Sequence, residues 1–259
     1  MLAVIILVTV MAVNRHESGA TSGSGVGSLA PASAAEESLG PVLLVPGYGG
    51  SMTSLEVLAR RLRLAGRAAQ VVTMPNAGTG DLAGQAEVLN SAVRQVISRT
   101  GSTSVDIVGY SAGGVVVRLW ALDDNGRHLA RRVVTLGSPH HGTNLAALAQ
   151  NLAGDQCQMA CQQLVPHSPL LNHLNAGDET PDGPEWVSIW STVDQTVTPP
   201  DSARLAGAVN LPVQSVCPQS SVSHGDLPTD PVVQALVLAE LGSGAPATFS
   251  AGDCRRLSS

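Results

Sequence analysis

Residues 105–113 read VDIVGYSAG, an aliphatic run followed by a turn of small residues around a serine. The run 105–108 has the composition of a buried strand, and a helix is predicted from residue 112 to about residue 122. Residues 109–113 match G-x-S-x-G, the pattern of a strained strand-to-helix turn that projects a serine hydroxyl outward. The helix N-terminus adds backbone N–H groups and a positive dipole end. We therefore predict that Ser111 is a nucleophile beside a site for developing negative charge.

Aliphatic runs on both sides of this turn predict further strands. They alternate with amphipathic stretches, which is the pattern of parallel strands joined by helical crossovers. Besides 105–108, strands are expected at residues 42–45, 69–73, 132–136, 187–190 and 213–216. Helical faces are formed by Leu55, Leu58 and Leu62 and by a stretch that Asp81 caps, and a last helix is predicted over 230–241. The sequence predicts a single α/β domain over residues 40–259, with about six mostly parallel strands and flanking helices.

Residues 143–184 interrupt this alternation. The stretch is rich in Leu, Gln, Asn and Gly, and it is too long for a plain connection. Insertions after a strand of such a sheet can lie above the carboxyl ends of the strands, where ligands bind. We interpret this stretch as a cap-like insertion over the site, and a surface excursion that only packs on the body is the alternative.

A base and an acid that could activate Ser111 follow it in the chain. A serine hydroxyl is a weak nucleophile until a base, itself held by an acid, removes its proton. Asp194 comes just after the strand predicted at 187–190, and His224 is the only histidine after Asp194. The order Ser, Asp, His is the one expected with this turn. Other acids nearby are interpreted as helix caps or solvated residues: Asp201, Asp226 and Asp230.

The loop after the first predicted strand, residues 46–51, reads PGYGGS. Its glycines let bare backbone face a substrate. We predict that the backbone N–H groups of Tyr48 and Ala112 form the oxyanion hole. An ordinary Gly-rich turn or a phosphate loop is the alternative, although the P-loop lysine and the G-x-G-x-x-G spacing are both missing from it.

Composition restricts the classes of partner. The chain has 259 residues, 44% hydrophobic and 2% aromatic, with a formal net charge of −6. The charge argues against broad nucleic-acid binding. With so few aromatic side chains, a cavity in the core would be lined by aliphatic groups and would suit apolar ligands.

The N-terminal segment, residues 1–39, is expected to lie outside the folded domain. Residues 1–13 are apolar with the length of a signal-peptide core, and a flexible Gly/Ser/Ala-rich linker follows. We expect a signal or anchor segment, and hence a secreted protein or one anchored in a membrane through residues 1–13 and facing outward.

The cysteines number four, and export would place them in an oxidising compartment. Three pairings exist, and nearness in sequence favours Cys157 with Cys161, which leaves Cys217 for Cys254. A metal site at Cys157 and Cys161 with His167 and His173 is the alternative, but the spacing is too short for a zinc finger.

Together these motifs resemble the α/β-hydrolase family, and within it the small secreted bacterial triacylglycerol lipases and esterases. The matching stretches are VPGYG at 45–49, GYSAG at 109–113, GSPHHGT at 137–143, Asp194 and His224. The resemblance implies hydrolysis of carboxylic esters, with a small-molecule ester or lipid as substrate and transient contact with a lipid–water interface. It implies a structural or substrate-lining role for His140 and His141. We expect a monomer without a cofactor, and no metal, because a calcium-site cluster of acids is missing from the sequence. An acyltransferase with the same triad and a non-catalytic cell-surface binding protein are the alternatives.

Overall fold

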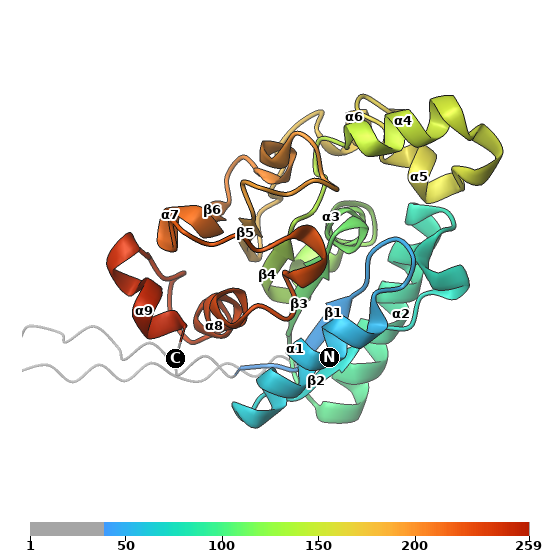
Figure 1. The fold of residues 1–259 in the computed structure, drawn as a ribbon. Coiled ribbons are helices and arrows are strands. Elements are labelled where there is room, and N and C mark those ends of the chain that lie inside the picture. The colour runs from blue at the N-terminus through green and yellow to red at the C-terminus, as the bar shows by residue number, and fades with distance from the viewer. Residues whose placement is uncertain (1–38, 259) are drawn as a thin grey trace, which may run out of the picture. The chain divides into compact units, whose positions relative to one another are not determined.

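The computed structural model describes residues 39–258, which are built around a six-stranded parallel sheet (Figure 1). Its strand order is β2-β1-β3-β4-β5-β6. In chain order the strands are β1 (Val42–Val45), β2 (Ala69–Val71), β3 (Val105–Tyr110), β4 (Ala130–Leu136), β5 (Glu185–Trp190) and β6 (Val209–Pro212). Every neighbouring pair runs parallel, so the predicted α/β class is confirmed. The predicted signal or anchor segment lies outside the described residues, Leu39 excepted.

One strand was predicted wrongly. The run 213–216 is a short helix, α7 (Val213–Val216), and the sixth strand is the segment β6 directly before it. Residues 213–216 read VQSV, which is too short to distinguish the two elements: Val213 and Val216 lie on one face of a helix, although valine also favours strands. Pro212 ends the strand at the edge of the sheet, where a missing N–H is tolerated.

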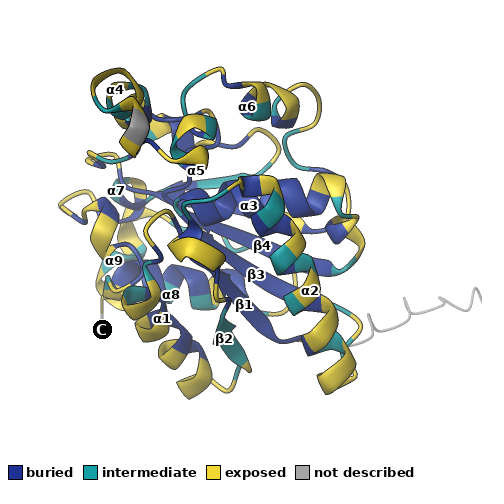
Figure 2. Ribbon diagram, turned by 90° about the vertical axis from the view of Figure 1, so that its right-hand side faces the viewer, coloured by how far each residue is buried: buried dark blue, intermediate teal, exposed yellow. Residues whose placement is uncertain are grey.

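Helices cover both faces of the sheet. The longer ones are α1 (Met52–Leu64), α2 (Leu82–Thr100), α3 (Ala112–Asp123) and α8 (Pro231–Glu240). Side chains of α2 and α3 pack with Leu43 and Ile107 on one face, and those of α1 and α8 pack with Leu44 and Val108 on the other. Alternate strand residues thus enter two separate cores, and Figure 2 shows the buried strands between the layers. In the part of the chain that the structure describes, no helix combines the length and apolarity needed to cross a membrane.

The insertion 143–184 contains three short helices, α4 (Asn144–Leu152), α5 (Met159–Gln163) and α6 (Pro169–Leu174). It is tied to the body at several points. Gln163 on α5 accepts a hydrogen bond from the backbone N–H of Leu82 at the start of α2. The buried guanidinium of Arg118 on α3 donates to the carbonyl of Leu174 and to the side chain of Asn175.

Two disulfides join the four cysteines. Cys157 pairs with Cys161 inside the insertion, and Cys217 pairs with Cys254 at the start of α9 (Cys254–Leu257). The predicted pairing is confirmed, and the first pair is not available as the thiolate ligands of a metal. In the described part of the chain, no three His, Cys, Asp or Glu side chains gather as a metal site would require.

Candidate active site

Ser111 is the one residue between the end of β3 and the start of α3, and its backbone angles are φ 53° and ψ −129°. A positive φ is strained for a residue with a side chain, and such strain persists only where the surroundings enforce it. A Cβ on Gly113 would lie 2.3 Å from the carbonyl oxygen of Val45, and one on Gly109 would lie 2.6 Å from the Cα of Gly114. The two glycines of the motif are therefore required by the close approach of β1, β3 and α3. The predicted strand, turn and helix are present.

His224 and Asp194 extend a line of hydrogen bonds from Ser111. The imidazole Nε2 of His224 lies 3.0 Å from Ser111 Oγ, and its Nδ1 lies 2.7 Å from Asp194 Oδ2. Both side chains are buried. The other carboxylate oxygen of Asp194 accepts hydrogen bonds from the backbone N–H groups of Thr196 and Val197, at 2.8 and 2.9 Å. These bonds fix the carboxylate, so Nδ1 carries the proton that Asp194 accepts, and Nε2 is left to accept the proton of Ser111.

Tyr110 holds the histidine loop in place, and sequence reasoning missed it. Its hydroxyl donates to the carbonyl oxygen of His224 at 3.1 Å, and its ring lies 5.3 Å from the imidazole, centroid to centroid. Burial, together with the negative charges of Asp194 and Asp226, raises the pKa of Tyr110 to about 12, so its hydroxyl remains a donor. The residue occupies an unconstrained position of G-x-S-x-G, so the motif carries no signal for it.

Tyr48 and Ala112 both belong to segments that pass close to Ser111. Ala112 is the first residue of α3, where backbone N–H groups lack partners within the helix. The loop of Tyr48 packs against the serine so closely that a Cβ on Gly47 would lie 2.7 Å from Ser111 Cβ. Both backbone segments are therefore in the region where an oxyanion hole is needed.

A cavity of about 370 Å³ opens beside Ser111, and we call it the inner cavity. Most of its wall comes from the insertion 143–184, including the Cys157–Cys161 disulfide. The lining residues are small, aliphatic or weakly polar: Tyr48, Ser111, Pro139, Thr143, Leu145, Ala146, Ala149, Ala153, Gln156, Cys157, Cys161, Leu164, Thr196 and Val197. No charged side chain is among these lining residues, so the wall suits an aliphatic chain.

His140 and His141 are not among the residues that line the inner cavity. His140 is fully buried, and its Nε2 lies 3.1 Å from Thr135 Oγ1. Burial and the nearby positive charge of Arg118 lower its pKa well below the usual value, which keeps the ring neutral. His141 is half-exposed and pairs with Glu179 at 2.8 Å.

Known proteins resemble this chain in sequence and in fold. The family model described as "Lipase (class 2)" matches residues 88–232, more than half of the chain. Triacylglycerol lipases of Pseudarthrobacter phenanthrenivorans and Burkholderia plantarii are each 36% identical over 69 residues, which is 27% of this chain. The matched segment spans 21% and 19% of the length of those two relatives.

Solved lipase structures share the architecture. Lipase B of Aspergillus fumigatus superimposes with a TM-score of 0.70 at 22% identity, over 80% of this chain and 54% of that one. The mature lipase BlEst2 of Bacillus licheniformis gives 0.58 at 22% identity, over 70% of this chain and 86% of that one. At these identities the likeness concerns the fold. With the family match over residues 88–232, the chain belongs to the class 2 lipase family and has the α/β-hydrolase fold.

Proposed function

We propose that this protein hydrolyses carboxylic esters of aliphatic acyl chains, with Ser111 as nucleophile, His224 as general base and acid, and Asp194 as the residue that orients the imidazole. The main support is the buried hydrogen-bonded series from Asp194 through His224 to Ser111, next to an uncharged cavity. Membership of the class 2 lipase family supports the same reaction class.

The reaction proceeds in two halves. Ser111 Oγ attacks the ester carbonyl carbon while its proton passes to His224 Nε2, and the carbonyl oxygen becomes an oxyanion. The bond to the alcohol oxygen then breaks, and His224 returns the proton to that oxygen, which leaves an acyl group on Ser111. Water attacks this acyl group while its proton passes to His224, the bond to Ser111 Oγ breaks, and His224 returns the proton to the serine. Asp194 stabilises the imidazolium in both halves without taking its proton.

The backbone N–H groups of Tyr48 and Ala112 serve this reaction as oxyanion donors. They are in place before the substrate arrives, because one lies in the loop that packs against Ser111 and the other starts α3. Such preorganised donors stabilise the charge that develops on the carbonyl oxygen, and each is worth about 3 kcal/mol of transition-state energy.

The inner cavity receives the acyl chain in this proposal. Its wall is uncharged, and its volume of about 370 Å³ lies near the lower end of the range for ligand pockets, roughly 300–1,000 Å³. The insertion 143–184 supplies most of the wall, which supports its interpretation as a cap over the site.

Initial rates on p-nitrophenyl esters from acetate to palmitate test the reaction. We expect turnover in the wild type, loss of it in Ser111→Ala, and no change in Ser91→Ala, which replaces an exposed serine on α2. A fluorophosphonate probe should label the wild type and not Ser111→Ala. Turnover retained in Ser111→Ala would contradict the assignment, and acyl transfer to an added alcohol in preference to water would favour an acyltransferase.

Transient contact with a lipid surface is part of the proposal. Leu145, Leu148 and Leu152 form one exposed face of α4, next to the inner cavity, and Leu152 is 78% exposed. The double variant Leu148→Ser/Leu152→Ser should bind neutral-lipid emulsions less than the wild type. Leu64→Ser, at a residue 77% exposed at the end of α1, is the matched control. Equal binding by all three proteins would contradict the contact.

Export and a monomeric state complete the proposal. The two disulfides support an oxidising compartment, because such bonds persist there and are rare in reducing ones. Sequencing the N-terminus of protein recovered from the culture medium tests export, and sedimentation tests the monomer.

A further inference from the structure

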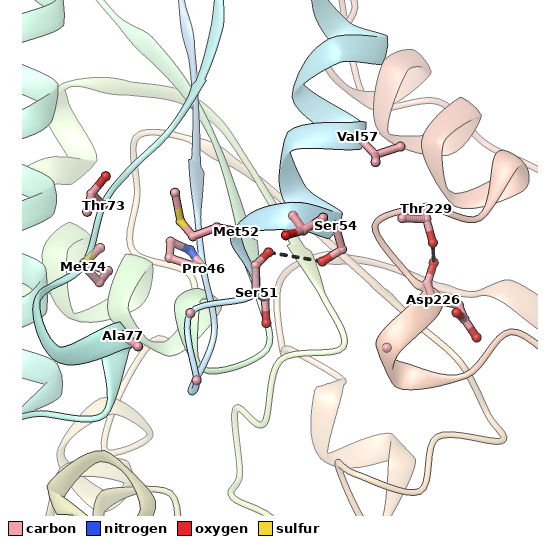
Figure 3. A pocket seen from close by; sticks show the side chains of 14 residues that line it. Pro46, Ser51, Met52, Ser54, Val57, Thr73, Met74, Ala77, Asp226 and Thr229 are labelled. Atoms are coloured by element: carbon pink, nitrogen blue, oxygen red, sulfur yellow. Dashed lines mark hydrogen bonds between the residues drawn. The ribbon is translucent and has the colours of Figure 1, made fainter.

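A second hollow, which we call the outer cleft, lies on the other side of the Tyr48 loop and has a volume of about 680 Å³. Figure 3 shows the side chains of Thr73, Met74 and Ala77 on one side of it and those of Asp226 and Thr229 on the other. The start of α1, with Ser51 and Met52, lies between them. The cleft shares no lining residue with the inner cavity.

The loop 46–50 separates the two hollows. Tyr48 lines the inner cavity, whereas Pro46, Gly49 and Gly50 line the outer cleft. In the proposed reaction the ester carbonyl is bound at this loop, with the acyl chain on one side. The alcohol part of the ester must then extend in another direction from the carbonyl carbon.

The proton transfer favours the outer cleft for that part. The leaving oxygen has to come within hydrogen-bond reach of His224 Nε2, because it takes its proton from this nitrogen. Gly225 directly follows His224 and lines the outer cleft, as do Asp226 and Thr229. The residues that line the inner cavity are Tyr48, Ser111 and residues from the loops after β4 and β5 and from the insertion, and none of them belongs to the loop of His224.

The chemistry of the wall indicates which alcohols fit. Hydroxyl groups of Ser51, Thr53, Thr73 and Thr229 alternate with the apolar side chains of Met52, Val57 and Met74: a mixed surface suited to an uncharged alcohol. Asp226 is the ionisable residue among those that line the cleft, and no Arg or His among them would balance an anionic group. A further hollow of about 430 Å³ shares Met52, Thr53 and Val57, so the open surface continues along α1.

We propose that the outer cleft binds the alcohol part of the ester, and that it suits uncharged alcohols bulkier than the acyl group held in the inner cavity. This inference rests on the proposed ester hydrolysis. It makes Val57 a specificity-determining residue, because its exposed side chain on α1 lines the outer cleft and also the further hollow that continues along this helix.

The test varies the two halves of the ester separately. One series keeps the butyryl group and changes the alcohol, from methyl butyrate to octyl butyrate. The other keeps methanol and lengthens the acid, from methyl butyrate to methyl octanoate. Acid release is followed by pH-stat titration for the wild type and for three variants. Val57→Trp fills the outer cleft, Ala149→Trp fills the inner cavity, and Leu64→Trp adds the same ring to an exposed position of α1 that lines neither.

We expect Val57→Trp to lower kcat/KM for octyl butyrate about tenfold or more, and to change it for methyl butyrate and methyl octanoate less than about twofold. Ala149→Trp should lower kcat/KM for methyl octanoate selectively, and Leu64→Trp should match the wild type. Thr73→Trp, which enters the cleft from the opposite wall, should repeat the effect of Val57→Trp.

Three outcomes overturn the inference. Equal effects of Val57→Trp on all three esters would show a general defect, and no effect would show that the alcohol does not bind there. A selective effect on methyl octanoate would place the acyl chain in the outer cleft. If the wild type hydrolyses none of the esters, the proposed function fails first, and that result is distinct because it does not depend on Val57.

Discussion

The two carboxylate oxygens of Asp194 have different partners. One accepts from two backbone N–H groups of its own loop, and the other accepts from His224 Nδ1 at 2.7 Å. In Asp194→Asn the amide can present an N–H group to Nδ1, which moves the ring proton to Nε2, where it blocks acceptance of the Ser111 proton. We therefore expect kcat to fall by about 10³–10⁴ while the fold is kept. Initial rates on p-nitrophenyl butyrate and the unfolding temperature measure the two effects.

Asp201→Asn is the matched control, since Asp201 is an exposed acid seven residues further along the chain. It should leave kcat unchanged. Comparable losses in both variants would exclude Asp194 as the orienting acid.

The meeting of Ser111, Asp194 and His224 could be predicted because each follows a strand of one parallel sheet. Ser111 follows β3, Asp194 follows β5, and His224 comes after β6 and α7. The carboxyl ends of parallel strands lie on the same side of the sheet, so residue type and chain order were sufficient to predict that these three residues come together. Tyr110 and His140 were different, because their roles depend on which groups the fold places against them. Burial beside Thr135 and Arg118 is a property of the packed core that no local pattern encodes.

At the scale of elements, short segments were the least predictable. The helix α2 has a long apolar face and an N-cap at Asp81, and the structure places that cap as expected, with the carboxylate accepting from the N–H of Gly84. The four residues of α7 have neither a long apolar face nor a capping side chain. Whether they form a helix or a strand depends on where β6 ends, at Pro212. The insertion could be located from its length. The contacts of α5 with α2 and of α6 with Arg118 join segments far apart in the sequence, so no local pattern predicts them.

The disulfide Cys157–Cys161 joins the middle of α5 to the segment between α4 and α5, and it also lines the inner cavity. Its partners are separated by four residues, whereas those of Cys217–Cys254 are separated by 37. The entropy of loop closure in the unfolded chain grows with loop length, which gives about 2 kcal/mol for the first and about 4 kcal/mol for the second. Urea unfolding should therefore show the smaller loss of stability in Cys157→Ala/Cys161→Ala.

Activity should show the opposite order. Cys157→Ala/Cys161→Ala should lower kcat/KM for long-chain p-nitrophenyl esters more than for the acetate, because it loosens a wall of the inner cavity. Cys217→Ala/Cys254→Ala should leave this ratio unchanged, since that bond lies outside the cavity wall. A greater change of chain-length preference in the second variant would exclude the first disulfide as a determinant of acyl binding.

At the scale of the whole molecule, the carboxyl ends and the amino ends of the strands have different roles. Ser111, Asp194 and His224 lie beyond the carboxyl ends of the strands. Near their amino ends, the buried carboxylate of Asp106 accepts from Arg67 and Arg131, each at 2.6 Å, and both arginines also donate to the carbonyl oxygen of Leu241 after α8. This cluster joins β3, β4 and the end of α8, so substitutions near it should change stability and leave kcat alone.

Glu240, the last residue of α8, makes the stability of the protein depend on pH. Its side chain is fully buried, and burial raises its pKa from the ordinary 4.5 to about 7, although the backbone of Ala247 and the charge of Arg132 act in the other direction. Between pH 4.5 and 7 the folded chain thus holds a proton that the unfolded chain has lost. The contribution of Glu240 to the free energy of unfolding is therefore complete below pH 4.5, falls as the pH rises towards 7, and stays level above.

Glu240→Gln removes this titration and keeps the shape of the side chain. Relative to the wild type, the variant should gain stability progressively between pH 4.5 and pH 7, by up to about 3 kcal/mol, because the neutral amide avoids burying a carboxylate. Urea unfolding at intervals across this range measures the gain, with Glu87→Gln on the exposed face of α2 as the control. A constant difference between Glu240→Gln and the wild type at every pH would mean that Glu240 titrates alike in the folded and unfolded chains. If kcat changed in parallel with the stability, the amino ends of the strands would be coupled to Ser111, His224 and Asp194.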